Sequence, residues 1–340
     1  MNTSEIVNTI TKTTTTTSIT TAATTISTRL ATRRTTRRTT KRATRRTTKK
    51  ATRPAITTPK AIMVHIPVNA KLVQKGVTVA GGHGEGSATN QLYWPRGFCV
   101  DDDQTLAIAD TWNQRITQWT KDGTTNGQVV AGGKGRGNGL NQLNIPTDVL
   151  IDKKTDNLII CDQGNRRVVR WSRRTGTTEG KILIDNIDCD GLAMDEQRYL
   201  YVSDYVQHEV RRYQLSEKNY TLVAGGNGLD NNNNRVMKWT KGAKEGIVVA
   251  GGQGQGNALT QLYLPKGLFV DILGTLYVVD WGNARVMRWT QGAKQGTVIV
   301  GGNGTGENQL RLPMGLSFDR HGNLYVADCG NNRVQRFSIK

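Results

Sequence analysis

The sequence predicts an all-β fold, a β-propeller of four-stranded blades with five complete blades and half of a sixth, preceded by a disordered tail. Three observations lead to this prediction. A unit of about 50 residues returns along most of the chain, each unit divides into short apolar runs separated by turn residues, and no 12-residue segment shows the 3.6-residue period of a helix. Length alone does not decide the number of domains, because 340 residues suit either several average domains or one large propeller.

The first 60 residues differ in composition from the rest. They hold 24 Thr and 14 Lys and Arg against the single acid Glu5, so they carry +13 of the net +19 and leave +6 to the other 280 residues. Almost no large apolar side chain occurs among them. Such a segment cannot bury enough surface to offset the entropy of ordering it, and we predict a disordered Thr/Arg/Lys-rich low-complexity tail over residues 1–70.

Three roles stay open for this tail: a solvated linker, an O-glycosylated stalk, or a segment that binds nucleic acid or another polyanion or serves as a nuclear signal. The lack of interleaved aromatic residues favours the linker. The candidates for polyanion binding are the cations of the repeated Thr-Thr-Arg-Arg blocks: Arg33, Arg34, Arg37, Arg38, Lys41, Arg42, Arg45, Arg46, Lys49 and Lys50.

Targeting and cysteine signals are weak. Residues 1–11 lack the basic and apolar regions of a signal peptide, and no stretch approaches the roughly 18 apolar residues of a membrane span. The compartment stays open between the cytoplasm and, if the N-terminus is incomplete, the extracellular space. We expect neither a zinc site nor a disulfide framework, because the four cysteines are far apart and form no CxxC pair: Cys99, Cys161, Cys189 and Cys329.

The propeller is predicted over residues 76–340. Full copies of the unit run over 79–119, 130–171, 249–289 and 300–337, with a more divergent copy over 182–213. In the copy that starts at 249, four strands are expected in KGLFVD, TLYVVD, ARVMRW and GTVIVGG. Alternation places Leu268 and Val270 on one face, opposite Leu276 and Val278 of the next strand. Radial stacking would bury both faces of each sheet.

Two recurring motifs have structural interpretations. An Asp ends the second strand of each unit and in five units an Arg follows five positions later, so we predict ion pairs that organise the turn: Asp110, Asp162, Asp204, Asp230, Asp280 and Asp328, with Arg115, Arg167, Arg235, Arg285 and Arg333. The Gly-rich segments GGHGEG, GGKGRG, GGQGQG and GGNGTG are predicted to be connections between blades. A phosphate loop would open a helix, and these do not.

The two ends of the repeat region complement each other. The last unit supplies three strands and no fourth, whereas GVTVAGG at residues 76–82 precedes the first unit and matches the fourth strands elsewhere. We therefore predict that the N-terminal strand completes the last blade and removes an open edge.

One repeat, over residues 221–250, is truncated. Its Gly-Gly turn runs almost directly into the Asn231 to Asn234 tract and RVMKW, so about two dozen residues that supply the first two strands elsewhere are missing. Three explanations stay open: a five-bladed ring that extrudes the remnant, a six-position ring with a wedge-shaped gap, or a splicing or gene-model error.

The segments LPKGLFVDILGTLYVVDWGNARVMRW and LPMGLSFDRHGNLYVADCGNNRVQRF resemble NHL repeats. The resemblance covers about 260 of the 340 residues. It implies a propeller, usually of six blades, with strands a to d running from the axis outward. The NHL propellers of tripartite-motif proteins bind RNA or protein. The RING and B-box modules of those proteins are missing from this sequence, so the resemblance implies no ubiquitin ligase activity.

Catalysis is the weakest of the predicted functions. Some six-bladed propellers are hydrolases or lyases that hold calcium or zinc in the central channel, and the resemblance extends to peptidyl-amidating lyases. The matching positions here make a poor set for a hard cation: Arg96, Thr147, Asp190, Lys266 and Met314. We predict no catalytic residue, no metal and no cofactor, and we keep a metal-dependent hydrolase or lyase as the second alternative.

A monomeric, non-catalytic binding scaffold with a protein partner is the leading hypothesis, because a rigid propeller presents variable loops on one face. RNA or polyanion binding through the basic tail and the propeller face is the first alternative. The candidates for the binding face are side chains that differ between otherwise similar turns: Arg96, Trp112, Asp148, Asp190, Tyr205, Lys266 and Trp281. For each of them, a solvated or locally packed loop residue is the plain structural interpretation.

Overall fold

The computed structural model describes residues 66–67, 71–121, 126–174, 176–215, 217, 219–226, 233–240 and 242–340. Nearly all of the predicted tail lies outside these residues, and so do the ten cations predicted to bind a polyanion. Asp230 and the first half of the Asn tract also lie outside them. Within the described part of the chain, no helix is long and apolar enough to span a bilayer.

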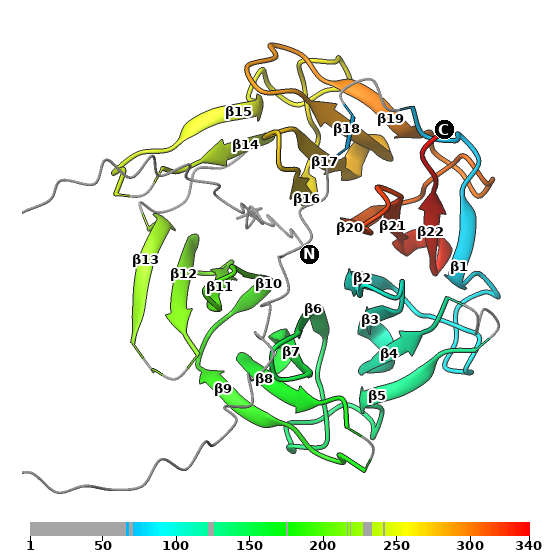
Figure 1. The fold of residues 1–340 in the computed structure, drawn as a ribbon, viewed down its shortest axis with the longest axis vertical. Coiled ribbons are helices and arrows are strands. Elements are labelled where there is room, and N and C mark those ends of the chain that lie inside the picture. The colour runs from blue at the N-terminus through cyan, green and yellow to red at the C-terminus, as the bar shows by residue number, and fades with distance from the viewer. Residues whose placement is uncertain are drawn as a thin grey trace, which may run out of the picture. The chain divides into compact units, whose positions relative to one another are not determined.

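The described strands form five four-stranded antiparallel sheets and one two-stranded sheet, placed as blades around a common axis (Figure 1). This arrangement confirms the predicted all-β propeller with five complete blades and a half blade. From the inner to the outer strand, the first two blades are β2 (Pro95–Val100), β3 (Leu106–Asp110), β4 (Arg115–Trp119), β5 (Gln128–Gly132), and β6 (Pro146–Asp152), β7 (Asn157–Asp162), β8 (Arg167–Ser172), β9 (Lys181–Asp185).

The other blades continue the same order. The third contains β10 (Cys189–Met194), β11 (Tyr199–Asp204), β12 (Glu209–Gln214) and β13 (Tyr220–Gly225); the half blade contains β14 (Arg235–Lys238) and β15 (Ile247–Gly251). The fifth contains β16 (Pro265–Val270), β17 (Leu276–Asp280), β18 (Arg285–Trp289) and β19 (Thr297–Gly301). The last contains β20 (Pro313–Phe318), β21 (Leu324–Asp328), β22 (Arg333–Phe337) and β1 (Val77–Gly81).

The period of two residues sets the pairing inside each blade. Leu268 lies opposite Val278, and Val270 lies opposite Leu276, as predicted. The register shifts after the first residue of the inner strand, where most blades have a proline. A proline has no N–H to give to a ladder, so the irregular first position of the strand accommodates it.

The ring closes through the N-terminal strand. β1 pairs antiparallel with β22, with Val77 opposite Arg336 and Gly81 opposite Arg333. The contact continues beyond the sheet, where the Val73 N–H donates to the Ser338 carbonyl at 2.8 Å. The predicted closure is confirmed, and Figure 1 shows β1 on the outer side of β22, beside the C-terminus.

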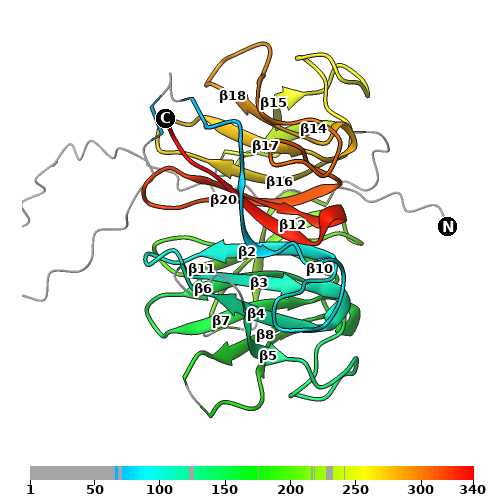
Figure 2. The same ribbon diagram turned by 90° about the vertical axis from the view of Figure 1, so that its right-hand side faces the viewer.

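The core lies between the blades rather than within one of them. Five clusters of buried apolar side chains each join two neighbouring sheets, as where Tyr325 and Val334 of the last blade pack with Phe98 and Trp119 of the first. In the side view, the strands of these stacked sheets run between two faces of the ring (Figure 2). None of the five clusters joins the third blade to the half blade.

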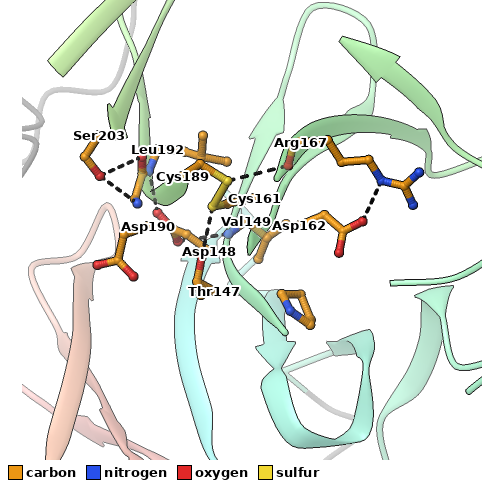
Figure 3. The surroundings of a disulfide bond; sticks show 12 residues. Thr147, Asp148, Val149, Cys161, Asp162, Arg167, Cys189, Asp190, Leu192 and Ser203 are labelled. Carbon is orange, nitrogen blue, oxygen red and sulfur yellow. Dashed lines mark hydrogen bonds and ion pairs between the residues drawn. A yellow bond between two sulfur atoms is a disulfide. The ribbon is translucent and has the colours of Figure 1, made fainter. Parts of the chain in front are cut away.

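One disulfide bond, Cys161–Cys189, links β7 to β10 (Figure 3). The expectation that the cysteines form no disulfide framework is therefore wrong for this pair. The two residues lie 28 positions apart in sequence, but the stacking of the second and third blades brings their Cα atoms to 5.8 Å, within the usual range for a disulfide. Cys99 and Cys329 are buried and take no part in a disulfide bond.

Candidate functional site

A repeated cluster of hydrogen bonds stabilises one face of the ring. On this face the inner strands begin, and the turns between the second and third strands of each blade, called b–c turns below, also lie there. In the first blade, the buried Asp110 carboxylate accepts hydrogen bonds from the Tyr93 N–H at 2.7 Å, from Asn113 Nδ2 at 2.8 Å and from Arg115 Nε at 2.6 Å. The predicted Asp–Arg pair recurs as Asp162–Arg167, Asp280–Arg285 and Asp328–Arg333 at 2.6–2.7 Å. The pair predicted for Asp230 lies outside the described residues.

The Arg of each cluster also holds the Gly-rich connection between blades. Arg115 Nη1 donates to the Ser87 carbonyl at 2.7 Å, and Nη2 donates to the carbonyls of Ala88 and Gln91. Arg167 and Arg285 make the equivalent contacts in their blades. The backbone carbonyls of the connection thus accept hydrogen bonds from a guanidinium. These contacts account for the Gly-rich segments as structural connections between blades.

The third blade replaces this cluster with a different one. Glu209 stands where the other blades have the Arg, and Arg211, two positions later, pairs with Asp204 at 3.2 Å and with Glu209 at 2.5 Å. Two carboxylates share one guanidinium in this turn, and the Gly-rich connection that precedes the other blades is missing from the sequence here.

Four of the predicted binding residues belong to inner strands: Arg96 of β2, Asp148 of β6, Asp190 of β10 and Lys266 of β16. The structure brings two of them together. Arg96 Nη2 lies 2.8 Å from Asp190 Oδ1, although their blades are separated by the second blade. The side chains are 13% and 34% exposed, so this ion pair is only partly accessible to solvent.

Asp148 connects two inner strands. Its Oδ1 accepts a hydrogen bond from the Val149 N–H, and its Oδ2 accepts one from the Leu192 N–H of β10, both at 2.9 Å (Figure 3). Most other blades have a glycine at this position. The side chain therefore fixes the spacing of β6 and β10, a structural role that accounts for its departure from the repeat.

The three aromatic candidates lie in or beside the b–c turns. Trp112 belongs to the 3-10 turn η1 (Thr111–Asn113), is 50% exposed and has its ring centroid 6.2 Å from that of Tyr93. Trp281 of η3 (Trp281–Asn283) is half-buried, and Tyr205 is half-buried with its N–H donating to the Asp188 carbonyl. Among these three, Trp112 offers the largest exposed aromatic surface.

Sequence reasoning missed two features beside these candidates. The disulfide holds β10, the strand that carries Asp190, and Thr147 Oγ1 donates to Cys161 Sγ at 2.9 Å. Arg166 Nε lies 2.9 Å from Asp188 Oδ1. The position in the repeat is the signal that could have found the disulfide, since Cys161 precedes the strand-ending Asp and Cys189 occupies the proline position of the next blade.

Burial shifts the pKa of three groups near this face. Burial raises the pKa of Asp110 and Asp162, while the hydrogen bonds that these carboxylates accept act in the opposite direction. Burial also raises the pKa of the Cys329 thiol, in the last b–c turn, far above its usual range, so this cysteine is not an activated nucleophile. No group of three His, Cys, Asp or Glu side chains placed to hold a metal occurs in the described part of the chain.

The NHL repeat model matches residues 92–119 and 310–337, the first three strands of the first blade and of the last. The protein is a β-propeller with NHL repeats in two of its blades. No curated protein sequence matches this NHL propeller.

Solved structures share the fold of the NHL propeller at low sequence identity. A protein of unknown function from Bacteroides thetaiotaomicron has a TM-score of 0.65 and 14% identity, covering 79% of this chain and 77% of that one. An auxiliary nutrient binding protein from the same organism has a TM-score of 0.60 and 15% identity, covering 79% and 77%. A gluconolactonase from Xanthomonas campestris has a TM-score of 0.51 and 14% identity, covering 82% and 100%. At these identities the likeness shows the fold alone.

Proposed function

We propose that this NHL propeller is a non-catalytic scaffold that binds a protein partner through the face of its b–c turns, with Trp112 as the central contact. The exposure of Trp112 carries the proposal. A half-exposed Trp on a turn that is fixed by buried hydrogen bonds loses little conformational freedom on binding, and Trp is enriched among the residues that dominate interface energies.

The frame around Trp112 supports this role. The turn is held by the Asp110 cluster, and the Trp112 N–H donates to the Tyr93 carbonyl at 3.2 Å. The indole therefore projects from a backbone that is fixed on both sides. Trp281 and Tyr205 occupy or flank the equivalent turns of other blades and would extend the contact.

The test compares two aromatic residues of equal exposure. Trp112 and Tyr220 are both 50% exposed, but Tyr220 lies on the outer strand β13. A photoreactive amino acid at position 112 identifies the partner, and the affinity of the purified partner is then measured for Trp112→Ala and Tyr220→Ala. We expect a loss of roughly 30-fold for Trp112→Ala and little change for Tyr220→Ala.

Two outcomes would overturn the proposal. Equal affinities of the two variants would show that the turn face is not the interface. Affinity for RNA that falls by orders of magnitude between about 50 and 200 mM salt, and that is lost with residues 33–53, would support polyanion binding instead.

A further inference from the structure

β14 is the third strand of its blade, but among the described strands it is paired on its outer side only. In the five complete blades, the third strand pairs with the second strand on its inner side and with the fourth on its outer side. Among the described strands, β14 pairs with β15 alone. Figure 1 shows no described strand between β14 and the centre of the ring. In each complete blade, the first and second strands lie on the inner side of the third strand.

The sequence of β14 indicates which kind of strand could pair with this edge. Residues 235–239 read RVMKW, and residues 285–289 of β18 read RVMRW, so the two third strands differ at one position. The edge of β18 receives β17, LYVVD, with Val278 opposite Met287 and Leu276 opposite Trp289. The same chemistry at β14 fits an extended segment of four or five apolar residues.

Side chains next to this edge are less buried than their counterparts. Met287 and Trp289 are 0% and 2% exposed, whereas Met237 and Trp239 are half-buried. On the third blade, which precedes the half blade, Tyr201 is half-buried, whereas Tyr277 at the same repeat position is 2% exposed. The third blade and the half blade, which follow each other in the ring, thus both retain partly exposed apolar side chains on their facing sides.

The inner strand of the third blade shows the same openness. A methyl group added at Gly97, Gly267 or Gly315 would come within 2.2–2.6 Å of an atom of the neighbouring inner strand. At Gly191 of β10 the nearest atom is 3.5 Å away and belongs to Ser203 of the same blade. The ring is therefore close-packed at the other inner strands and loose beside β10.

The half blade is nevertheless anchored on its other side. Asn234 Oδ1 accepts a hydrogen bond from the Leu264 N–H at 2.9 Å, and Val236 and Ala250 pack with Leu268 and Val278 of the fifth blade. A strand that binds at β14 would thus meet an edge already held in position.

We propose that β14 is an acceptor for β-strand addition and that its occupant is an extended apolar segment of a different protein, neutral or acidic in charge. The exposed Lys238 lies on this strand and this chain's own tail has 14 cations in its first 60 residues, so repulsion between like charges disfavours the tail as the occupant. A second copy is a poor donor as well, because its LYVVD strand is paired on both edges in its own blade. Main-chain hydrogen bonds supply affinity in this mode and alternate side chains supply selectivity.

The probe is a synthetic peptide of residues 265–280, PKGLFVDILGTLYVVD, which contains the inner two strands of a complete blade. Added to the full-length protein, it is expected to bind saturably and to raise Tm by about 5 °C when nearly saturating. A control peptide with Lys in place of Leu276 and Val278 is expected to leave Tm unchanged, because charged side chains would face the apolar walls.

Two protein variants locate the binding. Met237→Lys places a charge beside the acceptor edge and is expected to weaken the peptide at least tenfold. Val298→Lys, at a 42% exposed position on β19, is the matched control and is expected to bind normally. Near-UV circular dichroism checks that both variants are folded, and a photoreactive group in the peptide is expected to cross-link to β14.

Three results would each overturn the proposal: no binding of the peptide to the folded protein, equal binding by Met237→Lys and the native chain, or a dimer of the chain alone that Met237→Lys dissolves. The last result would assign the edge to a second copy. The proposal is independent of the Trp112 face, so Trp112→Ala is expected to bind the peptide normally.

Discussion

The third strands β18 and β14 have nearly the same residues but different surroundings. In β18, Met287 and Trp289 are almost fully buried because β17 covers one edge and the half blade covers one face. In β14, Met237 and Trp239 are half-buried, and β15 is the one described strand beside it. The comparison shows that burial of a third strand comes from its neighbours, and that one repeat can lose its inner strands while the blades that do not border it on that side keep their packing.

Removal of β1 would make a second incomplete blade and is expected to have the largest effect. Deletion of residues 76–82 leaves β22 without its outer partner and takes Ala80 out of the cluster that joins the last blade to the first. We expect Tm to fall by more than about 10 °C in a calorimetric scan. Deletion of residues 1–60 is the control and should leave Tm unchanged; an equal melt for both deletions would contradict closure by β1.

Truncation of the two corresponding tryptophans tests the comparison directly. Trp289→Ala removes a buried side chain and is expected to lower the free energy of unfolding by about 3–5 kcal/mol. Trp239→Ala removes a half-buried one and is expected to cost less than about half as much. Urea denaturation measures both, and equal losses would mean that the half blade is packed as tightly as a complete one.

The third blade shares a buried apolar cluster with the second blade and none of the five with the half blade, so it depends on its links to the second blade. Replacing Cys161 and Cys189 by Ala opens a loop of 28 residues and is expected to lower the free energy of unfolding by about 3–4 kcal/mol. Cys99→Ala, at a buried cysteine outside the disulfide, is the control and should cost no more than about 1 kcal/mol. A double variant as stable as this control would show that the disulfide does not hold the blade.

A smaller, pH-dependent link joins the same two blades. Arg198 of the third blade forms an ion pair with the buried Asp152 carboxylate of the second, and although burial alone would raise the pKa of Asp152, hydrogen bonds from Arg198 and Thr155 lower it below the ordinary value. As pH falls, the unfolded chain therefore takes up this proton first. The stabilisation is present above about pH 4 and is lost as pH falls through the folded-state pKa.

The change for this single carboxylate is expected to be about 1 kcal/mol. Denaturation at pH 7 and at pH 3 measures it, with Asp152→Asn as the comparison. The native chain should lose more stability between the two pH values than the variant does. Equal losses would show that the Asp152–Arg198 pair contributes nothing.

Much of the fold could be predicted because each blade repeats the same physical solution. The matching of GVTVAGG to the other fourth strands predicted the closure, and the recurrence of Asp followed by Arg predicted the pairs that hold the turns. Both depend on local patterns that occur several times in the sequence. Their recurrence made the structural interpretation stronger than any single motif would have been.

The candidate site could be predicted only in part, because its contacts cross between repeats. The Arg96–Asp190 pair joins the first blade to the third, and the Asp148 contact with the Leu192 N–H depends on how two inner strands are spaced. The disulfide was missed for the same reason, since pairing Cys161 with Cys189 requires knowing which face of one blade meets the next. Alignment of the repeats shows which residues occupy equivalent positions. It does not give the distances between non-equivalent residues of different blades.

The seam between β1 and β22 has a consequence for the order of events during synthesis. Its paired residues, such as Val77 and Arg336, are about 260 positions apart, so β1 leaves the ribosome long before its partner β22 and stays unpaired until that strand has followed. Contacts between such distant segments form slowly, and unpaired strand edges promote aggregation while they wait. Growing chains should thus need protection of residues 77–81 for most of translation, and a chain that stalls before Arg333 cannot close its ring.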